Sequence, residues 1–329
     1  MNYLITGGAG LIGVHVVKHL LHTDNDAYVV IYDLHPDQKN LDYVMNIAAK
    51  LRKEKDIEVV QGDMLDYNNL LHTVKENEIE AIIHLAAMLL ATGQEAPSKT
   101  VKVNVIGMAN VLDVARETRI VKVVYASTQA VYGSSKDYPD QPVAEGAMLN
   151  PRTCYGASKL LCERMAQLYK TRDSAVIGIR PTNAYGFGRI TGITGGFNNM
   201  IREAALGKGT VVVPPYFGEN TRISLVYVED AARYFCEAVR KELEHDIYNL
   251  GSRLYAFGEV IEVLQRVFPN TRFEYAKREG EPFLTDYPEL DASRIVKDFG
   301  FAPKYSLEQG IRAAAMEFLS VEHGNQGIS

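Results

Sequence analysis

The first half of the chain alternates short apolar runs with longer stretches in which apolar residues recur every three or four positions. The short runs predict β-strands, and the longer stretches predict amphipathic helices. Strands are expected at 2–6, 27–32, 58–60, 81–84 and 121–126. Helices are expected to end near His22, Lys53, Glu76, Thr118 and Lys170. This alternation predicts an α/β fold in which a doubly wound parallel sheet is covered by helices on both faces.

The second half is less regular and predicts a smaller lobe. It contains expected strands at 175–179 and 210–213, a glycine-rich segment at 186–196 expected to form a mobile loop, and a helix opening at Phe197. The apolar run at 225–230 is expected to return the chain to the large sheet. We therefore expect a domain of residues 1–182 joined by 226–252, a lobe of residues 183–225 and 253–320, and a tail at 321–329.

A glycine-rich turn, Gly7-Gly-Ala-Gly10-Leu-Ile-Gly13, connects the first strand to the first helix. Strand, glycine turn and helix form the setting that a dinucleotide site requires, because the backbone can approach a pyrophosphate at the helix N-terminus. The second strand ends at Asp33, twenty residues after Gly13. A carboxylate there accepts hydrogen bonds from ribose hydroxyls and repels a 2′-phosphate. The sequence therefore predicts NAD as the cofactor rather than NADP.

The candidate chemistry lies in Tyr155-Gly-Ala-Ser-Lys159, at the start of an expected helix. Residues four apart share a helix face, so the phenol and the ammonium are expected to be neighbours. Lowering a phenol pKa from about 10 to about 7 takes roughly 4 kcal/mol, which an ammonium at about 4 Å supplies at a dielectric near 20. Tyr155 could then accept a proton from a substrate hydroxyl. The same spacing in Tyr132-Gly-Ser-Ser-Lys136 has a loop-like interior, so its ends need not share a face.

Composition narrows the class of protein. The chain has 329 residues and a net charge of −6, which argues against nucleic acid or an anionic membrane as a partner. No apolar run is long enough to span a membrane, and three cysteines without C-x-x-C pairing suggest reduced thiols in the cytoplasm. His15, His19 and His22 share a helix face, but no carboxylate or cysteine in this pattern completes a metal site. We expect a small-molecule substrate and no metal.

These residues resemble the extended short-chain dehydrogenase/reductase family, which includes the NAD-dependent epimerases and dehydratases. The resemblance is carried by Thr6-Gly-Gly-Ala-Gly-Leu-Ile-Gly13, Asp33, Asp63, His84-Leu-Ala-Ala87, Asn104, Ser127-Thr128, Tyr155 and Lys159. It implies that Ser127 and Thr128 hydrogen-bond the reacting oxygen beside Tyr155, that Lys159 holds the nicotinamide ribose, and that the two long apolar helices form a homodimer interface. The cofactor residues it implies are Gly7, Gly10, Leu11, Ile12, Gly13, Asp33, Asp63, Met64, Leu85, Ala86, Ala87, Asn104, Tyr155 and Lys159.

The second half resembles the nucleotide-sugar epimerases. Asn183 and Asn199 match positions that face sugar or phosphate there, and Arg222 and Arg278 match arginines that meet the nucleotide diphosphate. Two arginines on one anion suit diphosphate recognition. Glu281 stands where that pattern usually has aspartate.

Two further comparisons concern the reaction. Sugar dehydratases of the family have Asp-Glu where this chain has Gln129 and Ala130, so dehydration is disfavoured and epimerisation is favoured. The alternative is a dehydrogenase of the short-chain L-threonine 3-dehydrogenase type. That group is resembled by His84-Leu-Ala-Ala-Met-Leu-Leu, Gly93-Gln-Glu95, Pro97 and Asn104, although it usually has tyrosine in place of Pro181. A third interpretation is an NAD-binding redox sensor, against which the Tyr155/Lys159 pair counts.

Overall fold

The computed structural model describes residues 1–140, 142–277 and 286–324. Its largest element is a seven-stranded sheet with the order β10-β6-β5-β4-β1-β2-β3, in which all neighbouring strands are parallel. The strands are β1 (Asn2–Thr6), β2 (Tyr28–Asp33), β3 (Ile57–Gln61), β4 (Ala81–His84), β5 (Lys122–Ala126), β6 (Ala175–Pro181) and β10 (Ile247–Leu250). The strand order reverses between β1 and β4, and the carboxyl ends of strands at such a point form a crevice for ligands.

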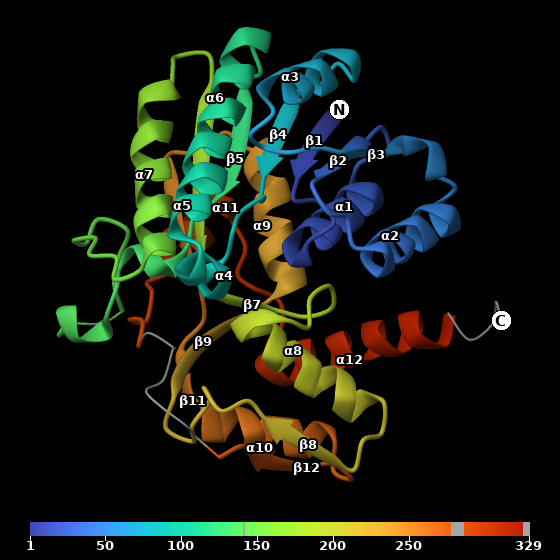
Figure 1. Ribbon diagram of the computed structural model, residues 1–329, viewed down its shortest axis with the longest axis vertical. Coiled ribbons are helices and arrows are strands. Elements are labelled where there is room, and N and C mark those ends of the chain that lie inside the picture. Colours follow the sequence, from blue (N-terminus) through green and yellow to red (C-terminus); the bar gives the residue numbers. More distant parts are fainter. Residues whose placement is uncertain (141, 278–285, 325–329) are drawn as a thin grey trace.

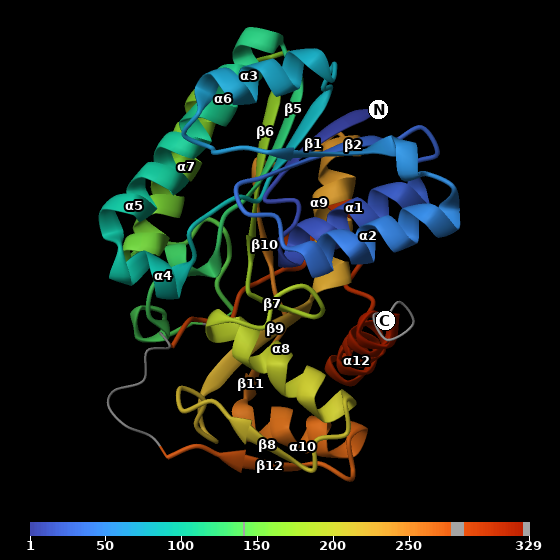
Figure 2. The ribbon, with the colours of Figure 1, turned by 45° about the vertical axis from the view of Figure 1, so that its right-hand side comes forward.

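Helices cover both faces of this sheet, as Figures 1 and 2 show. One face carries α1 (Leu11–Thr23), α2 (Gln38–Leu51) and α9 (Val228–Arg240). The other carries α3 (Tyr67–Glu76), α6 (Gly107–Thr118) and α7 (Cys154–Tyr169). The predicted doubly wound α/β architecture is confirmed. No helix among the described residues is both long enough and apolar enough to cross a bilayer.

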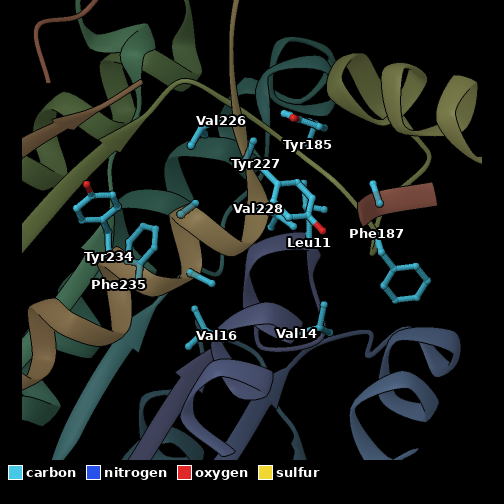
Figure 3. Close-up of a cluster of buried hydrophobic side chains, with 14 of the residues drawn as sticks. Leu11, Val14, Val16, Tyr185, Phe187, Val226, Tyr227, Val228, Tyr234 and Phe235 are labelled. Carbon is cyan, nitrogen blue, oxygen red and sulfur yellow. The ribbon is translucent and has the colours of Figure 1, made fainter. Parts of the chain in front are cut away.

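The core between α1 and α9 fixes the start of the first helix. Leu11, Val14 and Val16 of α1 face a cluster that includes Val228 and Phe235 of α9, as Figure 3 shows. Val14, Val16, Val228 and Phe235 are fully buried. Burying such a side chain contributes about 1.5–3 kcal/mol. A helix from the second half of the chain therefore anchors the glycine turn of the first half.

The helix predicted at 98–118 is interrupted in the structure. It consists of α5 (Pro97–Val101), a π-helix (Lys102–Ile106) and α6, and it is preceded by the short α4 (Leu90–Glu95). A π-turn adds a residue to the helical repeat and turns the side chains after it. Periodicity alone does not reveal the π-turn, because apolar residues continue through it.

The smaller lobe lies beyond the carboxyl ends of the large sheet (Figure 1). Its strands form a three-stranded sheet of order β11-β9-β7 and a two-stranded sheet of β12 and β8. They are β7 (Asn183–Tyr185), β8 (Thr210–Val213), β9 (Arg222–Tyr227), β11 (Leu254–Ala256) and β12 (Arg272–Tyr275). The later helices are α8 (Gly192–Ala205), α10 (Phe257–Val267), α11 (Ser293–Phe299) and α12 (Leu307–Gly324), and 3-10 turns occupy Glu54–Asp56, Gln129–Val131 and Ser135–Asp137.

Helix α8 corrects the expectation of a loop up to residue 196. It begins at Gly192 and includes Gly195 and Gly196. A Cβ at Gly196 would lie 2.0 Å from the Tyr216 hydroxyl oxygen, and one at Gly195 would lie 2.7 Å from the Ile190 carbonyl carbon. These glycines permit close packing of a helix and are not part of a loop. The local sequence alone does not show which of these two roles a glycine has.

Candidate active site

The turn between β1 and α1 consists of glycines because neighbouring backbone leaves no space for side chains. Gly7 has a φ of +67°, and a Cβ there would lie 2.7 Å from the Ala86 nitrogen. A Cβ at Gly13 would lie 2.4 Å from the Gly7 carbonyl oxygen. Gly10 precedes α1 without a capping side chain, so the amides of the first turn can bind an anion. This cradle fits the diphosphate of NAD.

Asp33 ends β2 beside the glycine turn. Its carboxylate accepts hydrogen bonds from the Ala9 amide at 3.3 Å and from the His35 amide at 3.1 Å. These contacts hold the carboxylate at the edge of the cavity, where it can accept from ribose hydroxyls and repel a 2′-phosphate. The residues present therefore fit NAD.

A cavity of about 580 Å³ runs along the carboxyl ends of the large sheet. The residues predicted to hold the cofactor all line it except Asn104. So do the four residues predicted to carry the chemistry, and Asn183. Strand ends far apart in the sequence thus meet in one cavity, as the parallel sheet requires.

Asn104 lies behind the cavity wall. Its side-chain oxygen accepts from the Met88 amide at 2.8 Å, and its amide donates to the Met88 carbonyl at 3.1 Å and to the Ser158 hydroxyl at 3.0 Å. The residue is buried in the π-helix. In the structure Asn104 therefore holds the segment after β4 against α7, and it does not line the cavity.

Tyr155 and Thr128 form the centre of the site. A Cβ at Gly156 would lie 2.5 Å from the Ala130 carbonyl oxygen, so a glycine allows the start of α7 to press against the turn at 129–131. This packing brings the Tyr155 phenol beside the Thr128 hydroxyl. The pair sits where β5 ends, inside the cavity.

The electrostatics of Tyr155 differ from the sequence prediction. Burial raises the pKa of Tyr155 to about 12, opposed by the hydrogen bond to Thr128 and by the charge of Arg189. Lys159 instead donates to the Ala126 carbonyl at 2.8 Å, and burial lowers the pKa of its ammonium. The four-residue spacing places both residues on one helix face, but it does not specify where a long, flexible side chain ends.

Ser127 points away from Tyr155. Its hydroxyl donates to the Glu163 carboxylate, which also receives Nε and Nη2 of Arg180 at 2.8 Å and 2.7 Å. Arg180 Nη1 donates to the Tyr132 hydroxyl at 2.6 Å. The strand places successive side chains on opposite sides, so only one of Ser127 and Thr128 can face the phenol. The structure gives that position to Thr128.

The residues expected to bind substrate are not all brought together. Asn183 lines the cavity and donates from its side-chain amide to the Ser224 carbonyl at 3.0 Å. Asn199 in α8 and the exposed Arg222 at the start of β9 do not line it. Arg278 and Glu281 lie outside the described residues. The pair of arginines expected at a diphosphate is therefore not assembled by the described part of the chain.

Arg189 lines the cavity, although no motif singled it out. It lies within the glycine-rich segment at 186–196 that follows β7, where an arginine is commonly a surface residue. Only its placement beside Tyr155 distinguishes it.

The histidines of α1 have partners that the local sequence does not show. His15 is fully buried, and its Nε2 contacts the Phe187 carbonyl oxygen at 3.0 Å. Glu229 and Glu317 approach it from α9 and α12. The sequence pattern showed no carboxylate that could complete a metal site with these histidines, because both carboxylates come from distant helices. Lys18 pairs with both carboxylates, at 2.7 Å for Glu317, so an ammonium already offsets part of their charge.

The chain was compared with known proteins. It matches the NAD dependent epimerase/dehydratase family over residues 3–251. It is 27% identical to the UDP-glucose 4-epimerase of Bacillus subtilis over 331 residues, covering 94% of each chain. The NAD complex of Thermus thermophilus UDP-glucose 4-epimerase superposes with a TM-score of 0.83 at 24% identity, covering 97% of this chain and 99% of that one. L-threonine dehydrogenase from Clostridium difficile gives a TM-score of 0.80 at 21% identity, covering 100% and 99%. At these identities the two structures show the fold alone.

Proposed function

This chain belongs to the NAD-dependent epimerase/dehydratase family, and we propose that it oxidises a secondary alcohol of a small-molecule substrate with Tyr155 as the base. The observation that carries this proposal is the placement of the Tyr155 phenol beside Thr128 inside the cofactor cavity. A phenol and a hydroxyl at one point can hold a substrate alcohol between them.

NAD, held by the glycine turn and Asp33, supplies the hydride acceptor for the carbinol carbon. Tyr155 accepts the hydroxyl proton, and the Thr128 hydroxyl donates to the same oxygen and orients it. The positive charge of Arg189 favours the phenolate form of Tyr155. Lys159 lines the cavity and donates to the Ala126 carbonyl, and we propose that it also holds the nicotinamide ribose.

We propose that the substrate is a nucleotide sugar and that the net reaction is epimerisation. Gln129 and Ala130 are buried and carry neither the acid nor the base that elimination of water needs. Epimerisation needs no acid or base beyond Tyr155 and Thr128. The Tyr155 phenolate would take the proton of the substrate hydroxyl while the hydride of the same carbon passes to bound NAD. After the keto sugar has turned, the hydride would return to the opposite face of that carbon and Tyr155 would return the proton to the oxygen. The likeness to UDP-glucose 4-epimerases supports this choice.

A dehydrogenase acting on a small hydroxy amino acid, as in L-threonine dehydrogenase, is the second candidate. Arg222 is exposed outside the cavity, whereas Arg189 lies inside it beside Tyr155. A short substrate with a carboxylate needs one cation near the reacting carbon rather than a distant diphosphate clamp.

We also propose a homodimer formed through α7 and the segment from α5 to α6. Apolar side chains on this surface are exposed: Val101 by 45%, Ile106 by 48%, Leu161 by 47% and Leu168 by 84%. An exposed group of large apolar residues is typical of an interaction surface. Sedimentation equilibrium would show twice the chain mass; a monomer would refute this assembly.

The functional proposal is tested with purified protein, NAD, and either UDP-glucose or L-threonine. An epimerase converts UDP-glucose to UDP-galactose without net NADH absorbance, whereas a dehydrogenase accumulates NADH with L-threonine. Tyr155→Phe should reduce turnover by at least a hundredfold, the lower range for a general base, and leave NAD affinity nearly unchanged. Full activity in Tyr155→Phe would show that the phenol is not the base.

A further inference from the structure

Arg189 lies in the wall of the cavity with an unused hydrogen-bond donor. Its Nη2 donates to the Thr194 hydroxyl, and its main-chain carbonyl accepts from the Asn198 side-chain amide at 2.8 Å. Its Nε is buried and has no partner among the described residues. A buried donor without a partner is uncommon and costs free energy, so its presence calls for an explanation.

The charge of Arg189 is also uncompensated. In the part of the chain that the structure describes, no carboxylate pairs with it, and the ionisable group that acts on it is the phenol of Tyr155. Burial consequently lowers the pKa of its guanidinium. A buried cation is normally paired because removing a charge from water is costly.

Arg180 shows how this chain satisfies a buried arginine that has only a structural role. Its Nε and Nη2 both donate to Glu163, and its Nη1 donates to the Tyr132 hydroxyl. Each nitrogen of the buried Arg180 guanidinium thus has an acceptor from the chain itself. In the described part of the chain Arg189 lacks such an acceptor for its Nε and faces the cavity, so its missing acceptor is best supplied by a ligand.

The position of Arg189 indicates which part of a ligand it meets. Tyr155 and Thr128 mark the reacting oxygen, and Arg189 lines the same cavity from the segment that follows β7. Its charge also acts on the Tyr155 phenol. Asp33, which is expected to meet the ribose hydroxyls of NAD, ends β2 and lines the cavity as well. An anion bound by Arg189 would therefore lie near the reacting carbon.

We propose that Arg189 binds a carboxylate or phosphate of the substrate next to the carbon that is oxidised. This rests on the proposed oxidation of a secondary alcohol and narrows the substrate to one whose carbinol lies close to an anionic group. A nucleotide sugar meets this condition if the sugar itself carries a carboxylate or phosphate. The guanidinium lines the cavity and is a planar group of donors that can pair with two oxygens of one anion.

The diphosphate of the cofactor is an alternative anion that could pair with Arg189. A Cβ at Gly188 would lie 3.1 Å from the Leu11 Cα, so the segment that carries Arg189 also passes the start of α1. The interaction with Tyr155 favours the substrate. An experiment must nevertheless fill the diphosphate site before it probes for an anion.

The experiment uses full-length protein saturated with NAD. Acetate and inorganic phosphate are titrated at constant ionic strength, and binding is followed by calorimetry. Wild-type protein should bind at least one anion, Arg189→Gln should weaken that binding tenfold or more, and Arg189→Lys should retain part of it. Preference for acetate would identify a substrate carboxylate, and preference for phosphate a substrate phosphate. The matched control is Arg272→Gln, which removes an exposed charge in the lobe and should change nothing.

Two outcomes would overturn the inference: equal anion binding by wild type and Arg189→Gln, or no binding by wild type. A tenfold loss of NAD affinity in Arg189→Gln without loss of anion binding would assign Arg189 to the cofactor and also overturn it. Tyr155→Phe should keep anion binding while losing turnover, so failure of the proposed function is distinguishable from failure of this inference. In active protein, Arg189→Gln should move the acidic limb of the pH–rate profile to higher pH, because losing the cation raises the pKa of Tyr155. A role confined to holding Thr194 would not produce this shift.

Discussion

The buried ion pair of Glu163 and Arg180 behind the active site provides a stringent test of the structural reasoning. The side chains are 6% and 3% exposed, and two hydrogen bonds of 2.8 Å and 2.7 Å join them. Glu163 also accepts from Ser127. The carboxylate holds Arg180 in its charged form and raises its pKa. Glu163→Gln keeps the size of the side chain but removes the charge and turns one acceptor into a donor.

The expected cost follows from these contacts. The introduced amide would still accept one hydrogen bond through its oxygen, but the other guanidinium donor would face an NH₂ group, and the buried charge of Arg180 would be unpaired. Removing one partner of a buried pair costs about 3–5 kcal/mol. By contrast, Asp246→Asn breaks a pair with Lys170 in which Lys170 is 46% and Asp246 38% exposed, and exposed pairs contribute about 0–1 kcal/mol.

Urea unfolding followed by far-UV circular dichroism measures both variants, since the chain has no tryptophan for fluorescence. Replacing both Glu163 and Arg180 by apolar residues of similar volume should recover much of the lost stability, because no unpaired charge remains. The reasoning is refuted if Glu163→Gln costs less than about 1 kcal/mol, the range of the exposed pair. It is also refuted if the double replacement is less stable than Glu163→Gln.

Three further predictions concern the cofactor side. Burial lowers the pKa of His84 to about 3; its unfolded value is about 6.5. Below pH 6.5 the unfolded chain therefore binds a proton that the folded chain does not bind until about pH 3, so the free energy of unfolding decreases as the pH is lowered. Between pH 6.5 and 5, urea unfolding should show that wild type loses about 2 kcal/mol more stability than His84→Gln. Equal losses would refute this assignment. Gly13→Ala should cost about 1–3 kcal/mol of stability, since its Cβ would lie 2.4 Å from the Gly7 carbonyl oxygen. In Gly10→Ala the corresponding distance is 3.2 Å, so the fold should persist while NAD affinity measured by titration falls at least tenfold; unchanged affinity would show that the phosphates do not approach Gly10.

Much of the fold could be predicted because the signals are local. Apolar runs and helical spacing depend on residues within one turn or one strand, and they located six of the seven strands of the large sheet, all but β10, and most of its helices. The glycines at 7, 10 and 13 and the aspartate at 33 belong to one strand-turn-helix-strand unit, so their meeting in one cavity followed from the sequence. The structure of the lobe was harder to predict. Its glycines at 195 and 196 permit close packing, at 196 against Tyr216, and the local sequence pattern does not indicate such a contact.

How much of the active site could be predicted depended on which residues, far apart in the sequence, the fold brings together. Sequence alone placed Tyr155, Lys159 and Thr128 at strand and helix ends that border one cavity, because a parallel sheet gathers such ends at one edge. Only the tertiary structure showed that Lys159 reaches the backbone of β5 and that Arg189 acts on the phenol. The direction and partners of a long side chain are set by groups that the fold brings together from elsewhere in the chain, and a linear pattern contains no record of them.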